Sequence, residues 1–279
     1  MKHVNHLFSL ALVAALLLGD AVCAKAQGEI TLLAPSPTRR PLDRILQNFQ
    51  AKSGYKVKVT YSGARTTTQS VAKGEAMDVS LVVAPVTGAL TSGAVIPDSM
   101  KLVASYQTAV IIPKGAPKPD ISTPAAVKKA LLAARSIGYE DPDFASAGQG
   151  PAEAIKNLGI EDQIASKSKL CANNTIYSPN STCFDPAGAG GTRSTRTTQK
   201  GLMSGDIDIG LLYLSDVLPD QDRLAIVGVL PRDVYTPTGI VGFISRRASD
   251  PSSAKALLEY LVSSEAQTIF KEEGFEPHK

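Results

Sequence analysis

Four short loops rich in serine, threonine and glycine each lie between a predicted strand and a predicted helix. In chain order they are residues 36–38, 62–66, 146–150 and 190–195. Ligands collect at the carboxyl ends of strands in open α/β sheets, and the free N–H groups of a helix start favour an anion. Ordinary helix caps use the same residue types, but here two loops fall in each half of the chain. We therefore predict an anion site where the four loops meet.

Five arginines lie in or beside these loops: Arg39, Arg40, Arg65, Arg193 and Arg196. A guanidinium group can bind a carboxylate or a large oxyanion through two parallel hydrogen bonds. The alternative is that most of these arginines are solvated residues at helix starts, and it stays open for each of them.

The residues that nucleophilic catalysis needs are scarce. His3 and His6 lie in the N-terminal segment and His278 is next to last, which excludes Ser-His and Cys-His mechanisms. Ser70 and Lys73 match the S-x-x-K pattern of serine β-lactamases, but the accompanying S-D-N and K-T-G motifs do not occur in the sequence. A serine hydrolase is therefore the weakest interpretation, and we expect no enzyme, no cofactor and no metal site.

Alternating strand and helix patterns must position the loops. Strands are predicted at 29–34, 56–61 and 78–84, with helices at 42–49 and 66–73 between them. This βαβαβ order predicts a parallel sheet with helices on both faces. The apolar run 102–112 is long enough to pass from one lobe to another. Further helices are predicted at 125–134, 150–158, 195–203, 252–262 and 264–273, and further strands at 136–140, 206–213, 226–230 and 238–245.

The N-terminus has the features of a secretory signal. Lys2 precedes a short apolar run at 7–18, and Ala24 and Ala26 supply the small residues before a cleavage site at Gln27. We predict that residues 1–26 are a cleavable signal peptide and that the mature protein is periplasmic.

Two cysteines remain after this cleavage, Cys171 and Cys183. They flank a stretch rich in Asn, Ser, Thr, Pro and Gly. In an oxidising compartment such a pair is expected to form a disulfide, here one that pins an insertion at 171–191. The nearly balanced charge, 29 Lys and Arg against 26 Asp and Glu, argues against a nucleic-acid surface.

The sequence resembles the type II periplasmic binding proteins of ABC importers, and among them the molybdate-binding family. The resemblance is carried by residues 31–36, 61–65, 74–79, 206–216 and 263–277. It implies an α/β protein of two lobes, each a mainly parallel sheet flanked by helices, with two hinge crossings near Tyr106 and Tyr235. We expect one lobe to combine 28–105 with 236–279, and the other to span 106–235.

The resemblance also implies site residues. Family members bind a small anion such as molybdate or tungstate with hydroxyls and backbone N–H groups in an uncharged pocket, and deliver it to an importer permease. The corresponding positions here are Ser36, Ser62 or Gly63, Ala147, Thr195 and Tyr213. Thr38 shares the first loop with Ser36.

The chain departs from this family pattern where Gly63, Ala64 and Arg65 replace small hydroxyl residues. A pocket lined with arginine suits an organic carboxylate gripped by Arg65 or Arg193 at least as well as an oxyanion. A free-standing ligand sensor is a further alternative, and in each case we expect a monomer.

Overall fold

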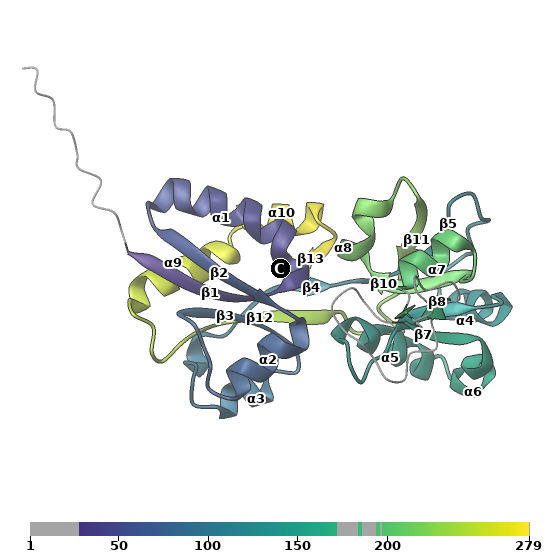
Figure 1. Cartoon of the computed structure of the whole chain (residues 1–279), viewed down its shortest axis with the longest axis horizontal. Helices are drawn as coiled ribbons and strands as arrows, with labels where there is room; N and C mark the ends of the chain where they lie inside the picture. The colour runs from purple at the N-terminus through teal and green to yellow at the C-terminus, as the bar shows by residue number, and fades with distance from the viewer. Residues whose placement is uncertain (1–27, 172–183, 186–193, 196, 279) are drawn as a thin grey trace, which may run out of the picture.

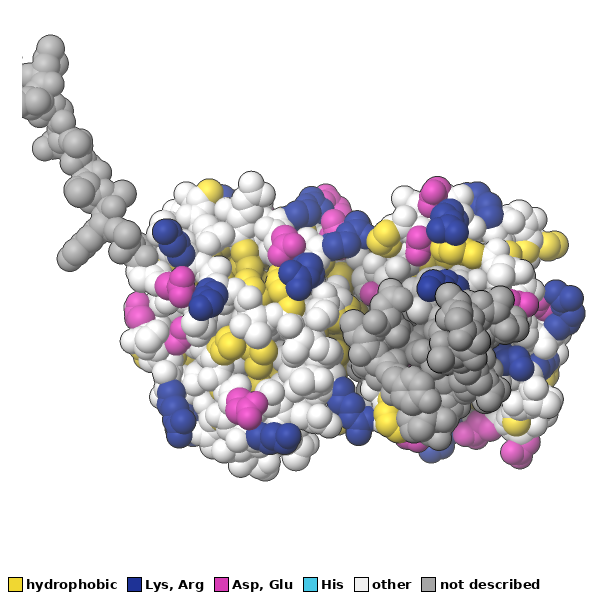
Figure 2. Space-filling view, viewed as in Figure 1, with side chains coloured by type: hydrophobic (Ala, Val, Ile, Leu, Met, Phe, Trp, Pro, Cys, Tyr) yellow, Lys and Arg dark blue, Asp and Glu magenta, His cyan; other side chains and the backbone are white. Residues whose placement is uncertain are grey.

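The computed structural model describes residues 28–171, 184–185, 194–195 and 197–278. They form two lobes, each built on its own sheet, which lie end to end along the long axis (Figure 1). Basic and acidic side chains are spread over both lobes on the face shown in Figure 2. The six-stranded sheet of the first lobe has the order β13 (Phe275–Pro277), β4 (Lys101–Tyr106), β12 (Thr238–Ile244), β3 (Val79–Val83), β1 (Glu29–Pro35), β2 (Lys56–Ser62). The five-stranded sheet of the second lobe has the order β11 (Leu224–Val229), β5 (Thr108–Pro113), β10 (Ile209–Tyr213), β6 (Ile137–Glu140), β7 (Ser168–Cys171).

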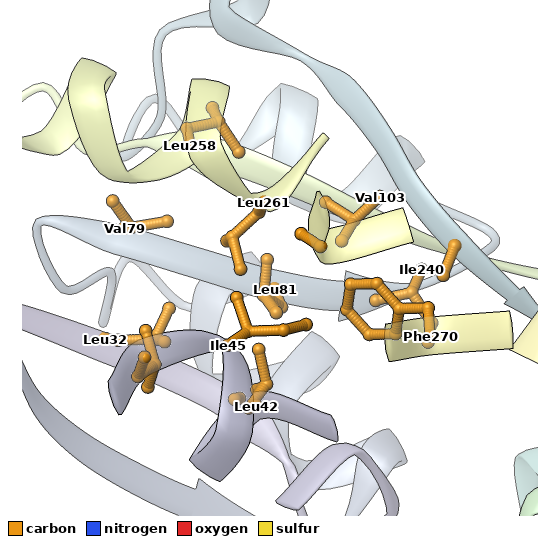
Figure 3. Close-up of a cluster of buried hydrophobic side chains, with 14 of the residues drawn as sticks. Leu32, Leu42, Ile45, Val79, Leu81, Val103, Ile240, Leu258, Leu261 and Phe270 are labelled. Carbon is orange, nitrogen blue, oxygen red and sulfur yellow. The ribbon is translucent and has the colours of Figure 1, made fainter. Parts of the chain in front are cut away.

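Helices cover both faces of the first sheet. Alternate residues of β1 point to opposite faces, so Leu32 packs with α1 (Arg39–Ser53), α9 (Pro251–Leu261) and α10 (Ser264–Glu272). Leu33 packs on the other face with α2 (Ala64–Ala72) and α3 (Thr87–Thr91). Figure 3 shows the first of these cores, where Leu42 and Ile45 of α1 meet Leu81 of β3 and Phe270 of α10.

The second lobe has the same construction. On one face its sheet packs with α4 (Pro124–Ala133), α5 (Gln149–Asn157) and α6 (Glu161–Ile164). On the other face it packs with α7 (Thr198–Ser204) and α8 (Leu214–Val217). A short antiparallel pair, β8 (Phe184–Asp185) with β9 (Ser194–Thr195), lies outside the main sheet.

The two-lobed α/β architecture predicted from the sequence is confirmed, but each sheet is mixed. Pairing is parallel only where β1 joins β2 and β3, and where β6 joins β7 and β10. It is antiparallel elsewhere, because β12 returns from the second lobe to lie between β3 and β4.

The apolar run predicted at 102–112 is two strands. β4 belongs to the first sheet and β5 to the second, and Gln107 lies between them. The chain crosses back between β11 and β12. The residue boundaries given above for the lobes stay a prediction.

Contacts near Gln107 hold the crossing in place. Its carbonyl accepts a hydrogen bond from the Leu214 N–H at 2.9 Å. Gly274 then lies so close to α8 that a Cβ there would come within 2.8 Å of Leu218 Cδ1 and 3.0 Å of the Ser215 nitrogen. Because Gly274 also has φ +83°, both its conformation and its surroundings favour glycine.

The helix ends follow capping rules. Gly54 ends α1 in the left-handed conformation, the position where a glycine is favoured. The helix predicted to open at Ser252 instead begins at Pro251, with the Asp250 side chain as its N-cap. The last helix, α10, is capped by Ser263.

Candidate functional site

A cavity of about 390 Å³ lies between the two lobes. Its wall combines segments that follow β1, β2, β6 and β10 with the start of α7, so strand ends of both sheets contribute. The first lobe supplies Ser36, Pro37, Arg39, Arg40, Gly63, Ala64 and Arg65. The second lobe supplies Glu140, Ala145, Ser146, Ala147, Thr197, Gln199, Tyr213, Ser215, Asp216 and Pro219.

The loop after β1 divides its predicted residues between the cavity and the protein interior. Ser36 lines the cavity. Thr38 is fully buried, and its hydroxyl donates to the Pro35 carbonyl at 2.6 Å. Thr38 therefore closes the short 3-10 turn between β1 and α1 and does not line the cavity, contrary to our expectation.

The loop after β2 behaves in a similar way. Gly63 and Arg65 line the cavity at the start of α2. Ser62 does not, because its hydroxyl lies 2.8 Å from that of Thr67 in the first turns of the helix. Thr67 in turn bonds the Gly63 carbonyl through both its backbone N–H and its hydroxyl. Ser62 thus holds the loop that presents Gly63.

The loop after β6 can take its shape only with glycine at position 148. A Cβ on Gly148 would come within 2.2 Å of the Glu140 carbonyl oxygen and 2.6 Å of the Pro142 nitrogen. Both contacts are with backbone atoms that cannot give way. This tight turn places Ser146 and Ala147, one of the predicted ligand-binding residues, against the cavity.

Tyr213, the last residue of β10, lines the cavity but is only 1% exposed. Its hydroxyl donates to the Ser146 carbonyl at 2.8 Å. Burial raises the pKa of Tyr213 well above its usual range. The hydroxyl is therefore neutral, and its proton already fixes the neighbouring loop.

The fourth predicted loop differs from its prediction. Thr195 lies in β9, paired with Phe184, and α7 begins three residues later at Thr198. Thr197 is the N-cap, since its side chain accepts the Lys200 N–H at 3.2 Å. Thr197 and Gln199 line the cavity where we expected Thr195. Arg193 lies outside the described residues, as does Cys183.

The arginines of the first lobe differ in their surroundings. Arg40 forms an ion pair with Glu273 at 2.9 Å. The guanidinium carbon of Arg39 lies 3.9 Å from the centre of the Tyr61 ring, a cation–π contact. Arg65 is exposed and has no ion-pair partner in the part of the chain that the structure describes. The cavity therefore has a cationic wall on the side of the first lobe.

Sequence reasoning missed the acidic and hydroxyl groups of the opposite wall. Asp216 lies in the first turn of α8, half-buried at the cavity, and burial raises its pKa to about 6. Ser215 is 8% exposed, and its hydroxyl has no hydrogen-bond partner among the described residues. Glu140 is a second acidic residue that lines this wall. The available signal was that Ser215 and Asp216 lie two and three residues after Tyr213.

Other features of the described residues bear on the class of protein. Ser70 and Lys73, the residues of the S-x-x-K pattern, do not line the cavity. The described residues include no group of three or more His, Cys, Asp or Glu placed to hold a metal ion. None of the described helices has the length and apolar character needed to cross a membrane.

Comparison with known proteins agrees with this geometry. The sequence pattern of the family described as bacterial extracellular solute-binding proteins matches residues 30–276. An aconitate isomerase from a Pseudomonas species is 25% identical over 271 residues, which cover 94% of each chain.

Solved structures show the same fold. The substrate-binding domain of a putative molybdenum ABC transporter from Clostridium difficile superposes with a TM-score of 0.71 at 17% identity, covering 91% of this chain and 100% of the other. The periplasmic molybdate-binding protein of Azotobacter vinelandii gives 0.61 at 17% identity, covering 90% and 100%.

Two α/β lobes (Figure 1) with a cavity between them, lined by strand ends of both, define a type II solute-binding protein. The chain belongs to the bacterial extracellular solute-binding protein family.

Proposed function

We propose that this protein captures a small organic polycarboxylate in the cleft between its lobes. The observation that carries the proposal is the cationic wall, where Arg39 and Arg65 face the cavity without a carboxylate partner among the described residues. Guanidinium groups bind carboxylates through paired hydrogen bonds. The starts of α1, α2 and α5 lie beside the same cavity and add the positive ends of their dipoles.

The cavity has room for an organic anion that is larger than a tetrahedral oxyanion. Molybdate or tungstate would fill only a small part of about 390 Å³. The relative named aconitate isomerase supports an organic anion, because aconitate is a tricarboxylate. The solved relatives with molybdate in their names share the fold at 17% identity, which leaves the ligand open.

Ligand contacts from both lobes would favour a closed form of the protein. A ligand shifts such an equilibrium by its difference in affinity for the two forms. We propose that a signal peptide at 1–26 directs the chain to the periplasm, and that the liganded monomer delivers its anion to an ABC importer permease. A free-standing sensor would use the same cleft, and a permease and ATPase encoded next to this chain would favour transport.

Calorimetry on the mature protein, residues 27–279, tests the ligand class. Tricarballylate, trans-aconitate and citrate are compared with molybdate, tungstate and sulfate. We expect binding of at least one carboxylate, weakened about tenfold or more by Arg65→Gln because a charge-assisted pair is lost. Arg247→Gln, which changes an exposed arginine outside the cavity, is the matched control. If an oxyanion bound and none of the carboxylates did, the proposed ligand class would be wrong and the ligand would be of the molybdate type.

A second candidate function is isomerisation of the bound polycarboxylate. It is favoured by the name of the Pseudomonas relative, aconitate isomerase, and by Asp216, whose pKa of about 6 suits a group that accepts and returns a proton near neutral pH. Proton NMR of cis-aconitate in D₂O with the protein would follow loss of the starting isomer and deuterium incorporation. Turnover that disappears in Asp216→Asn would establish this activity, and an unchanged spectrum would exclude it.

A further inference from the structure

The two walls of the cleft differ in chemistry. The wall of the first lobe presents Arg39 and Arg65, which are hydrogen-bond donors only. The wall of the second lobe presents the carboxyl group of Asp216 and the hydroxyl of Ser215. A ligand that consisted only of carboxylates would satisfy the first wall and place negative charge against Asp216 on the second.

Asp216 and Ser215 are acceptors that the protein itself leaves unused. No hydrogen bond or ion pair involves Asp216 in the part of the chain that the structure describes, and burial alone raises its pKa. The Ser215 hydroxyl is more than nine-tenths buried and likewise lacks a described partner. A buried polar group without a partner is costly, so both groups favour a ligand that donates a hydrogen bond.

The charge of the cleft decides which donor fits. Arg40 is neutralised by Glu273, and Glu140, which also lines the cavity, already takes part in another interaction. Asp216 is thus the cavity carboxyl group without a partner among the described residues, and it lies on the wall opposite Arg39 and Arg65. An amino acid zwitterion would leave one guanidinium without a counter-charge, whereas a hydroxyl donor keeps the ligand anionic.

We infer that the ligand is a hydroxy polycarboxylate, whose carboxylates lie against the arginines of the first lobe and whose hydroxyl donates to Asp216 on the second. This inference rests on the carboxylate-binding function proposed above and narrows it to a ligand with one anionic and one donating side. Ser215, next to Asp216, accepts or donates to the same group.

Calorimetry at pH 8 with pairs that differ by one hydroxyl tests this inference. Malate is compared with succinate, and citrate with tricarballylate. We expect the hydroxylated member of at least one pair to bind about tenfold more tightly or better, as for a hydrogen bond to a charged acceptor. Equal affinities within both pairs would overturn the hydroxyl assignment and leave the carboxylate function standing. Binding of none of the four compounds would overturn both.

Two substitutions locate the effect. Asp216→Ala should reduce the preference for the hydroxylated member to less than about threefold. It should not weaken binding of the other member, because a negative charge has been removed. Asp216→Asn keeps the side-chain volume and should reduce the preference by at least about threefold, since neutral hydrogen bonds are weaker.

Asp220→Ala, in the same segment but outside the cavity, is the matched control. A preference that survives both changes at Asp216, or aspartate binding more tightly than malate, would exclude this assignment.

Discussion

The rings of Tyr106 and Tyr213 stack at 4.3 Å between centroids with only 8° between their planes. Tyr106 ends β4 of the first sheet and Tyr213 ends β10 of the second, so the stack joins the two lobes beside the cleft. Phe275 of β13 extends it, 5.1 Å from Tyr106. A ligand that contacts Tyr213 is therefore one aromatic ring away from the segment where the chain crosses between lobes.

Tyr213→Phe should keep this stack and lose the hydrogen bond to the Ser146 carbonyl. We expect the free energy of unfolding to fall by about 1–2 kcal/mol, and ligand affinity to fall because the loop at Ser146 and Ala147 loses its fixed position. Chemical denaturation and calorimetry measure the two effects. Tyr139→Phe also removes a partly buried tyrosine hydroxyl, but away from the cavity. Tyr139→Phe should lower the free energy of unfolding and leave ligand affinity unchanged. An equal loss of affinity in Tyr139→Phe would contradict a specific role of Tyr213 in positioning the binding loop.

Glu273 competes with an anionic ligand for the guanidinium group of Arg40. Its carboxylate bonds Arg40 at 2.9 Å and Arg44 at 2.8 Å. Glu273→Gln should release the Arg40 guanidinium and raise the affinity for a polycarboxylate several-fold, with a stability cost of about 1 kcal/mol because both arginines are exposed. Calorimetry on Glu272→Gln provides the comparison, since Glu272 pairs with Arg44 only. An increase in affinity of the same size in both variants would point to general electrostatics.

Asp216 should make the protein less stable as the pH rises. Its pKa is raised from the ordinary 3.8 to about 6 by burial beside Tyr106 and Tyr213. The folded protein therefore binds the proton more tightly than the unfolded chain does. The resulting stability is complete below pH 3.8 and is lost as the pH rises through 6.

Urea denaturation of the wild type and of Asp216→Asn at pH 5 and pH 7.5 checks this. The variant should gain stability relative to the wild type at the higher pH, on the order of 2 kcal/mol. Asp220→Asn serves as the control and should leave the pH dependence as it is. If the two proteins respond identically to pH, the carboxyl group of Asp216 is not desolvated in solution.

Gly274→Ala should disturb the contact between the end of the chain and α8. The new Cβ would meet Leu218 and Ser215, and the backbone has φ +83°. Gly159→Ala isolates the conformational part, because Gly159 has φ +61° with open space around it. We expect Gly159→Ala to cost about 1 kcal/mol, and Gly274→Ala to cost more and to weaken ligand binding. Equal costs and unchanged binding would show that α8 adapts freely.

The predicted Cys171–Cys183 disulfide is open to a direct check. Cys171 is buried at the end of β7. Peptide mass spectrometry of the protein, exported with its N-terminal segment and kept unreduced, should find the two cysteines in one linked pair. Two free thiols would rule the bond out.

Local patterns predicted the first lobe well. The strands β1, β2 and β3 and the helices between them begin and end within a few residues of their predicted positions, because side-chain period and the left-handed Gly54 are local signals. β13 was missed, since three residues become a strand only by pairing with β4, which lies far away in the sequence.

The site was predicted less completely for the same reason. Of the predicted ligand-binding residues, Ser36, Gly63, Arg65, Ala147 and Tyr213 line the cavity, and their binding of a ligand stays a prediction. Thr195 was misplaced because Thr197, two residues on, is an equally good cap. Asp216 was missed because nothing in its neighbours along the chain indicates how much water the tertiary structure removes from its carboxyl group.

The central position of β12 has a consequence for biosynthesis. β3 and β4 are neighbours in the chain, yet in the sheet they are separated by β12, which is made much later. A nascent chain that ends before residue 238 holds every strand of the five-stranded sheet. Of the six-stranded sheet it holds β2, β1 and β3 as one block and β4 separately, because β12 is still missing between them. The sheet of the first lobe can therefore be completed only after the final segment of the chain has been synthesised.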